Sequence, residues 1–237
     1  MVHSIGTSPY QLSQEQVSRF RRDGVLGPLP SDSPCLEGLL ELLQEAFPSG
    51  AAGGKSNALD PQLRMPEIQD LARHPSLVHP VAQLLGCNEL SFFQARFRVK
   101  TSALADLQPW HQDVGANHGG LFDDGTPIPS FTVWLSLDGA DADSGAVALL
   151  PGTHRSLLGE WQKGFHGLRG SQDSLDTSQT MTLVTPPRHF HIFHSWVVHC
   201  SLTNNSRKPR SALILRYMDR RHAVHVSFPH EPCGLNG

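Results

Sequence analysis

The chain has 237 residues and a formal net charge of −3, and 17% of its residues are charged. This length allows one large domain or two small ones, and it suffices to bury a core without a disulfide or structural metal. The mildly acidic balance argues against nucleic-acid and membrane-surface binding, which need a basic face, while 21 glycines and 18 prolines predict many tight turns and favour a β-rich fold.

The first ninety residues are predicted to be helical, and the first helix begins after Ser13. Ser13 and Gln16 match the capping-box pattern, in which side chain and backbone satisfy each other at a helix start. Val17 and Phe20 follow at the spacing of one helical face, and Gly24 is suited to end the helix.

Three further helices are predicted before the β-rich part of the chain. Ser33 followed by Pro34 marks a helix start, and the leucines after it recur at helical spacing. Shorter helices are expected at residues 67–73 and 76–85, the second ending at Gly86, a residue type favoured at helix C-termini.

From Leu90 onward the sequence consists of short segments rich in β-branched and aromatic residues, separated by turn-forming residues. Such segments predict a β-sandwich or jelly roll. No linker marks a boundary, so we expect a single domain over residues 1–237, with a helical layer at 1–89 and a β core at 90–237. The segments are SFFQARFRVK, FTVWLSL, AVALL, MTLVT, HIFHSWVVH and SALILRYM.

The cysteines bear on the cellular compartment. They are far apart and form no CxxC pair, so neither a disulfide framework nor a zinc site is expected, and a reducing, cytoplasmic location is favoured. The N-terminus lacks the apolar stretch of a secretory signal, and no apolar run is long enough to span a membrane. The cysteines are Cys35, Cys87, Cys200 and Cys233.

A candidate metal site begins at His111 and Asp113. On an extended chain, residues two apart point to the same side, so one imidazole and one carboxylate can bind one cation. Taken alone, this pair is more often a turn with a hydrogen-bonded histidine. With His199 as third ligand it gives two histidines and one carboxylate, the pattern of non-haem Fe(II) oxygenases.

Two residues that follow His199 in the sequence, Ser201 and Arg210, are suited to bind a 2-oxo acid. The Arg210 guanidinium can bind a carboxylate through two parallel hydrogen bonds, and Ser201 can share the face of His199.

Histidines 189, 191 and 194 form an alternative cluster, but no carboxylate is near them in the sequence, so we interpret them as part of a strand. His154 is interpreted as a structural residue at a strand end.

The order of these motifs identifies a family resemblance that covers most of the chain. The chain resembles the phytanoyl-CoA dioxygenase (PhyH-like) family of Fe(II)/2-oxoglutarate-dependent oxygenases, and the resemblance implies a double-stranded β-helix, a cupin-like barrel, behind an N-terminal helical layer. The motifs that carry it are LSQEQVSRFRRDG, LLG, QARFRVK, WHQD, TVWLSLD, SGAVALLPGTH and HSWVVHCSLTNNSRKPRSALILRY.

The resemblance also implies residue roles. Fe(II) is bound by His111, Asp113 and His199, and O₂ is the oxidant. The distal carboxylate of 2-oxoglutarate is bound by Arg210 and Ser201. Further positions are expected to contact or flank this co-substrate: Gln94 and Trp134, with Lys100 and Thr132 as weaker candidates.

The expected activity is hydroxylation, or another oxidation, of an unactivated C–H bond in a small molecule. Related halogenases lack the carboxylate that Asp113 provides, and the short chain favours a natural-product intermediate or small metabolite over a bulky acyl-CoA. Two alternatives remain open: a non-catalytic metal-binding jelly roll, and a cupin-type metalloenzyme that does not use 2-oxoglutarate and has no need of Arg210.

Three structural questions also remain open at this stage. A two-residue turn at Asn204-Asn205 would place His199 opposite Arg210 in a hairpin, whereas the family's barrel would place them on facing sheets. The glycine-rich loop at residues 118–126 is either a substrate lid or a solvated loop. The arginines near the C-terminus either contact an anionic substrate or, as is more usual for such a run, form a solvated face; they are Arg216, Arg220 and Arg221.

Overall fold

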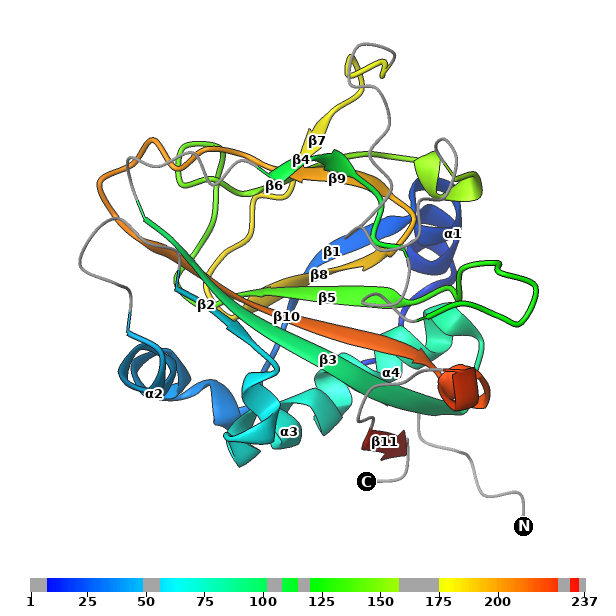
Figure 1. The fold of residues 1–237 in the computed structure, drawn as a ribbon, viewed down its shortest axis with the longest axis horizontal. Coiled ribbons are helices and arrows are strands. Elements are labelled where there is room, and N and C mark those ends of the chain that lie inside the picture. The colour runs from blue at the N-terminus through cyan, green and yellow to red at the C-terminus, as the bar shows by residue number, and fades with distance from the viewer. Residues whose placement is uncertain are drawn as a thin grey trace.

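A computed structural model of the chain describes residues 8–48, 56–101, 108–114, 120–157, 175–225 and 231–234. These residues form two facing antiparallel sheets with helices packed on the outside (Figure 1). The mainly β jelly roll with a helical layer is therefore confirmed. Within the described ranges, no helix is long and apolar enough to cross a membrane.

The larger sheet contains seven strands, all paired antiparallel. Its central strands β5, β10 and β3 lie side by side across the middle of the molecule (Figure 1). The strand order is β1 (Val25–Pro30), β8 (His189–His194), β5 (Phe131–Ser136), β10 (Arg210–Asp219), β3 (Glu89–Lys100) and β11 (Glu231–Gly234), with β2 (Ser56–Leu59) paired to β3.

The smaller sheet has four strands and faces one side of the larger sheet (Figure 1). Its order is β4 (Gln108–His111), β9 (Val198–Ser201), β6 (Val147–Leu150) and β7 (Met181–Thr182). Because β9 and β10 belong to different sheets, the hairpin alternative for His199 and Arg210 is wrong. Asn204 instead braces the connection, donating from its amide nitrogen to the carbonyl oxygens of Lys100 and Lys208, each at 2.8 Å.

Helices cover the face of the larger sheet that points away from the smaller one, with α2 and α3 below the sheet in Figure 1. The α-helices are α1 (Gln14–Asp23), α2 (Leu39–Ala46), α3 (Pro66–Arg73) and α4 (Pro75–Leu85). Short 3-10 helices are η1 (Pro34–Leu36), η2 (Pro61–Leu63), η3 (Thr153–Arg155) and η5 (Arg220–His225).

Helix α1 has the predicted ends. The Gln16 backbone N–H donates to Ser13 Oγ at 3.2 Å, and the Gln16 side-chain oxygen accepts from the Ser13 backbone N–H at 2.8 Å. Gly24 ends the helix with φ at +75°, a conformation that glycine adopts without strain. The capping box predicted from the sequence is therefore confirmed.

The N-terminal part is less helical than predicted. The helix expected after Ser33 is interrupted at Gly38, whose φ of +69° separates η1 from α2. Two strands, β1 and β2, also lie within the first ninety residues. β1 contains Pro28 and Pro30, and an edge strand tolerates proline because its outer N–H groups have no ladder partner.

Alternation along the central strands creates two apolar cores. On β10, Leu213, Leu215 and Tyr217 belong to the core shared with the helices. Ala212 on the opposite face belongs to the core between the sheets, where Ile214 packs against it. Successive strand residues point to opposite faces, so the central strands are buried on both sides. Their inner face lines the space between the two sheets.

The helix-side core should carry much of the stability. Leu71 on α3 is fully buried in that core, whereas Leu63 on η2 remains 62% exposed. We expect Leu71→Ala to lower the free energy of unfolding by about 2–5 kcal/mol, because it removes buried methyl groups and leaves a cavity. Leu63→Ala is the matched control and should change it by less than about 0.5 kcal/mol. Urea unfolding measures both, and equal losses would contradict this assignment of the core.

Candidate active site

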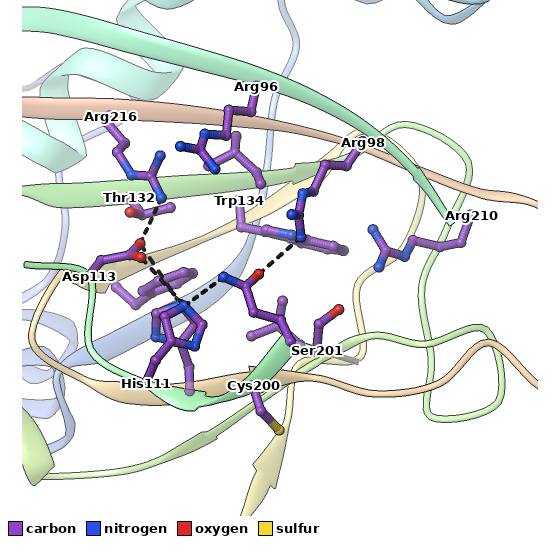
Figure 2. Close-up of a pocket in the computed structure, with 15 residues that line it drawn as sticks. Arg96, Arg98, His111, Asp113, Thr132, Trp134, Cys200, Ser201, Arg210 and Arg216 are labelled. Atoms are coloured by element: carbon purple, nitrogen blue, oxygen red, sulfur yellow. Dashed lines mark hydrogen bonds and ion pairs between the residues drawn. The ribbon is translucent and has the colours of Figure 1, made fainter. Parts of the chain in front are cut away.

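A pocket that is partly open to solvent lies between the two sheets. Its walls come from β4 and β9 on one side and from β3, β5 and β10 on the other, and Figure 2 shows polar side chains from both walls directed into it. The inner faces of both sheets therefore contribute polar side chains to one pocket.

His111, Asp113 and His199 converge in this pocket. His111 ends β4 and is paired in register with His199 on β9. His111 Nε2 lies 3.5 Å from Asp113 Oδ1, and His199 Nε2 lies 3.8 Å from Asp113 Oδ2. All three side chains are buried, and their candidate ligand atoms lie within 4.8 Å of one another. The structure thus brings together the three residues that the sequence singled out.

Backbone carbonyls fix the orientation of both imidazoles. His111 Nδ1–H donates to the Pro109 carbonyl at 2.8 Å, and His199 Nδ1–H donates to the Val197 carbonyl at 2.9 Å. A carbonyl only accepts, so each Nε2 is the unprotonated nitrogen on the side of Asp113. That of His111 accepts from the Gln108 side-chain amide at 3.0 Å. Burial lowers the pKa of His199 to about 3, which keeps this imidazole neutral, the form that binds metals.

This donor set fits a ferrous ion. Two neutral imidazole nitrogens and one carboxylate, clustered on one side of a pocket, match the ligands of non-haem Fe(II) sites, which leave other coordination positions for co-substrates. The hydrogen bonds to Pro109 and Val197 supply the outer contacts that orient metal-binding histidines.

Arg216 corrects a prediction, because it does not belong to a solvated face. It is 4% exposed, and its Nη2 donates to Asp113 Oδ2 at 2.7 Å. Its other terminal nitrogen, Nη1, donates to Gln94 Oε1. Alternation on β10 turns Arg216 into the pocket, whereas Arg220 and Arg221 on η5 keep side chains that are 50% and 78% exposed.

Gln94 therefore lies behind Arg216. Its side-chain oxygen accepts from the guanidinium that is bound to Asp113. Figure 2 shows this guanidinium, which comes from β10, directed at Asp113. Gln94, Arg216 and Asp113 form one connected series of buried polar groups. The Asp113–Arg216 ion pair could not be predicted from local sequence patterns, because more than one hundred residues separate its partners.

Arg210 lies at the other end of the pocket from Asp113 (Figure 2). Its Nη2 donates to the Gly145 carbonyl at 2.7 Å, and its guanidinium carbon lies 5.3 Å from the centre of the Trp134 ring. Ser201 also lines the pocket, and its Oγ accepts from Lys100 Nζ at 2.8 Å. The Ser201 hydroxyl hydrogen is thus left to donate to a further acceptor.

Two pocket arginines were not identified from the sequence. Arg96 and Arg98 both line the pocket from β3. Arg98 Nη1 donates to Gln108 Oε1 at 3.0 Å, and Gln108 Nε2 lies 3.0 Å from His111 Nε2, so Arg98 is connected to a triad member. The available signal was the alternation in QARFRVK, which sends every second residue, all of them polar, to the inner face.

Other predicted residues occupy less central positions. Thr132 lines the pocket, and its buried Oγ1 has no hydrogen-bond partner within the described ranges. His191 Nδ1 lies 3.2 Å from Thr185 Oγ1, and His194 stacks near Phe131 with ring centres 5.4 Å apart. These contacts favour the interpretation of the alternative histidine cluster as part of a strand.

The glycine-rich loop is described only from Gly120 onward, and residues 118 and 119 lie outside the described residues. Residues 121–127 close on themselves, with an isolated bridge between Leu121 and Pro127. The Phe122 N–H also donates to the Thr126 carbonyl at 2.8 Å. The lid interpretation stays a prediction.

Comparison with known proteins gives one family match. A family model described as phytanoyl-CoA dioxygenase (PhyH) matches residues 49–212, more than half of the chain. No curated protein matches the chain significantly.

Solved structures with the same fold are numerous. The epimerase SnoN, in complex with Fe³⁺, α-ketoglutarate and nogalamycin RO, is 21% identical with a TM-score of 0.68, over 86% of this chain and 82% of that chain. CytC3 with Fe(II) and α-ketoglutarate is 23% identical with a TM-score of 0.64, over 90% and 79%. EvdO2 from Micromonospora carbonacea var. aurantiaca, complexed with 2-oxoglutarate, is 18% identical with a TM-score of 0.68, over 96% and 94%.

The ion pair between Arg216 and Asp113 generates a stability prediction. In metal-free protein, Arg216→Met should lower the free energy of unfolding by about 3–5 kcal/mol, because Asp113 loses its guanidinium partner in a buried site. Adding Asp113→Asn should restore part of that loss by removing the charge. Urea unfolding of both single variants and the double variant forms the test. Additive losses would contradict a direct interaction.

The buried histidines of β8 generate a prediction about pH. Burial lowers the pKa of His191 to about 4 and that of His194 to about 3, from an ordinary value of 6.5. Below pH 6.5 the unfolded chain therefore binds more protons than the folded protein. The free energy of unfolding should fall as the pH decreases from 6.5 toward 4, by up to about 1.4 kcal/mol per pH unit for each histidine.

Replacing one of these histidines isolates its share of the pH dependence. His191→Gln should reduce the slope by up to that amount, because glutamine does not titrate. Unfolding by urea at half-unit pH steps measures the slope for the variant and the wild type. Parallel curves for the two proteins would show that His191 does not contribute.

Proposed function

The chain belongs to the phytanoyl-CoA dioxygenase (PhyH) family of Fe(II)- and 2-oxoglutarate-dependent oxygenases, and from this premise we propose that it hydroxylates an unactivated C–H bond of a small molecule. The observation that carries the proposal is the convergence of His111, Asp113 and His199 in a buried pocket that also contains Arg210. We treat residues 1–237 as one oxygenase domain, and the four separated cysteines support a reducing, cytoplasmic location.

In this proposal the three converging residues hold Fe(II). His111 and His199 supply their Nε2 lone pairs, which the carbonyls of Pro109 and Val197 orient. Asp113 supplies a carboxylate oxygen while Arg216 holds its Oδ2. Bound together, iron and 2-oxoglutarate supply the activation of O₂ that no side chain can provide.

Arg210 and Ser201 bind the distal carboxylate of 2-oxoglutarate. The Trp134 ring beside the guanidinium and the Gly145 carbonyl hold Arg210 in position. Lys100 holds Ser201 Oγ, so that the hydroxyl hydrogen is available to the carboxylate. Trp134 flanks the co-substrate in this arrangement. Gln94 acts on the site through Arg216, which it contacts.

The pocket walls support oxidation of a small organic substrate. Val147, Phe193 and Ile214 line the pocket and limit the access of water to the reacting groups. Asp113 occupies the position that related halogenases leave without a carboxylate, which supports hydroxylation over halogenation. SnoN and SnoK are described as enzymes of nogalamycin biosynthesis, and this likeness supports a natural-product intermediate or small metabolite as substrate.

Anaerobic titration with Fe(II) and then 2-oxoglutarate tests the proposal. We expect the weak visible charge-transfer band of an Fe(II)–2-oxoglutarate complex, and its loss in His199→Ala and Asp113→Ala. Arg210→Ala should weaken 2-oxoglutarate binding by about 10- to 100-fold, because it removes a charge-assisted hydrogen bond. Arg220→Ala, on an exposed 3-10 helix, is the control that should leave the band unchanged.

Exposure of the same samples to O₂ separates the alternatives. Succinate formation that depends on Asp113 and His199 would support the oxygenase. Fe(II) binding without any 2-oxoglutarate band would favour a cupin-type metalloenzyme, and a band without succinate formation would favour a non-catalytic binding protein. Substantial turnover by Asp113→Ala would contradict the assignment of the metal ligands.

A further inference from the structure

The charged side chains that line the pocket are mostly arginines. Four arginines line it, Arg96, Arg98, Arg210 and Arg216, while Asp113 is the carboxylate among its described lining residues. Buried charges are costly unless they are paired. The ion pair between Arg216 and Asp113 accounts for one of these guanidinium groups. Arg98 and Arg210 also have interaction partners, so Arg96 is the guanidinium that remains to be considered.

The proposed co-substrates add no net charge that would compensate Arg96. A ferrous ion adds two positive charges and the 2-oxoglutarate dianion adds two negative charges, so together they leave the balance unchanged. An additional anion would lower the electrostatic cost of the site. This step rests on the proposed function, because it assumes that both groups are bound.

Arg96 is the pocket arginine whose side chain has no partner among the described residues. Arg98 donates to Gln108, and Arg210 donates to the Gly145 carbonyl. The Arg96 side chain makes no hydrogen bond or ion pair with the described residues, and its buried Nε has no hydrogen-bond partner there. Burial lowers the pKa of Arg96 to about 10, which still leaves it charged at neutral pH.

The strand register places Arg96 in the middle of the inner face. It pairs across β3 and β10 with Ile214, which pairs in turn with Trp134 on β5. The neighbouring row of the sheet contains Arg216 and Thr132, and Figure 2 shows the Arg96 guanidinium directed into the pocket between Arg216 and Trp134.

Thr132 gives a second, independent observation. Its buried Oγ1 also has no hydrogen-bond partner within the described ranges. Buried polar groups in folded proteins are generally hydrogen-bonded to protein, water or ligand. The Nε of the part-buried Arg96 guanidinium and the buried Thr132 hydroxyl thus remain available on the same face of the sheet. Both lie near Arg216, which is bound to the triad residue Asp113.

We infer that the primary substrate is an anion whose carboxylate is bound by Arg96, with the Thr132 hydroxyl as a second donor. Its apolar part packs against the pocket surfaces of Phe193 and Ile214. Arginine suits this role because its planar fork matches a carboxylate. The inference deepens the proposed function by naming the substrate class that the same site selects.

Binding of matched probes to the Fe(II)- and 2-oxoglutarate-loaded protein tests this inference without turnover. Benzoate, phenylacetate and hexanoate are titrated anaerobically by calorimetry, each beside its uncharged primary amide. We expect at least one carboxylate to bind about tenfold more tightly than its amide, as a charge-assisted pair predicts. Arg96→Gln should abolish that preference, and Arg96→Lys should retain part of it.

Two controls show whether the change is specific to the proposed carboxylate site. Arg64→Gln removes the same charge at an exposed position of the chain and should keep the preference. The 2-oxoglutarate affinity and visible band of Arg96→Gln should match those of the wild type, which also shows that the variant is folded.

The outcomes separate the two proposals. A visible band without any preference for a carboxylate over its amide would overturn the inference and leave the oxygenase intact. A tenfold loss of 2-oxoglutarate affinity in Arg96→Gln would assign Arg96 to the co-substrate and overturn the inference as well. Absence of the band in the wild type would overturn the proposed function and this inference with it.

Discussion

The two-residue alternation of antiparallel strands governs both the stability and the chemistry of this protein. In β3, β5 and β10, alternate side chains point to the helices or to the second sheet. The helix-facing set is apolar, as in Leu213, Leu215 and Tyr217. The other set is where polar groups such as Arg210 and Arg216 are held. The same strands thus contribute to the apolar core on one face and line the pocket on the other.

This arrangement places charged side chains in a buried site, where each charge needs a partner. Asp113 is 2% exposed and Arg216 is 4% exposed, so neither is stabilised by bulk water. Their ion pair, extended to Gln94, compensates each charge and holds the carboxylate in one orientation. Hydrogen bonds from both imidazoles to backbone carbonyls do the same for the histidines. The geometry of the three converging residues is therefore supported by a surrounding set of polar contacts.

Local sequence signals predicted the features that depend on neighbouring residues. The cap at Ser13, the end of α1 at Gly24 and the jelly-roll strands all follow from short-range patterns. The residues at 111, 113 and 199 were identified from the chemistry of their side chains, and the structure brings them to one point.

Features that depend on tertiary pairing were not predictable in the same way. The sequence around β1 contains two prolines and no clear alternation, and it forms a strand because β8 offers an edge to pair with. Grouping Arg216 with the arginines that follow it predicts a solvated face, whereas the register of β10 turns it into the pocket. Its partner Asp113 lies far away in the sequence, so only the three-dimensional arrangement identifies it.

The prolines of β1 have a consequence for how the molecule behaves among its own copies. β1 forms one edge of the larger sheet, and Pro28 and Pro30 have no N–H to offer along that edge. An exposed edge with a full row of donors can recruit the strand of another molecule and begin aggregation. Because these donors are missing, the β1 edge is a poor template for such pairing with another copy of the chain.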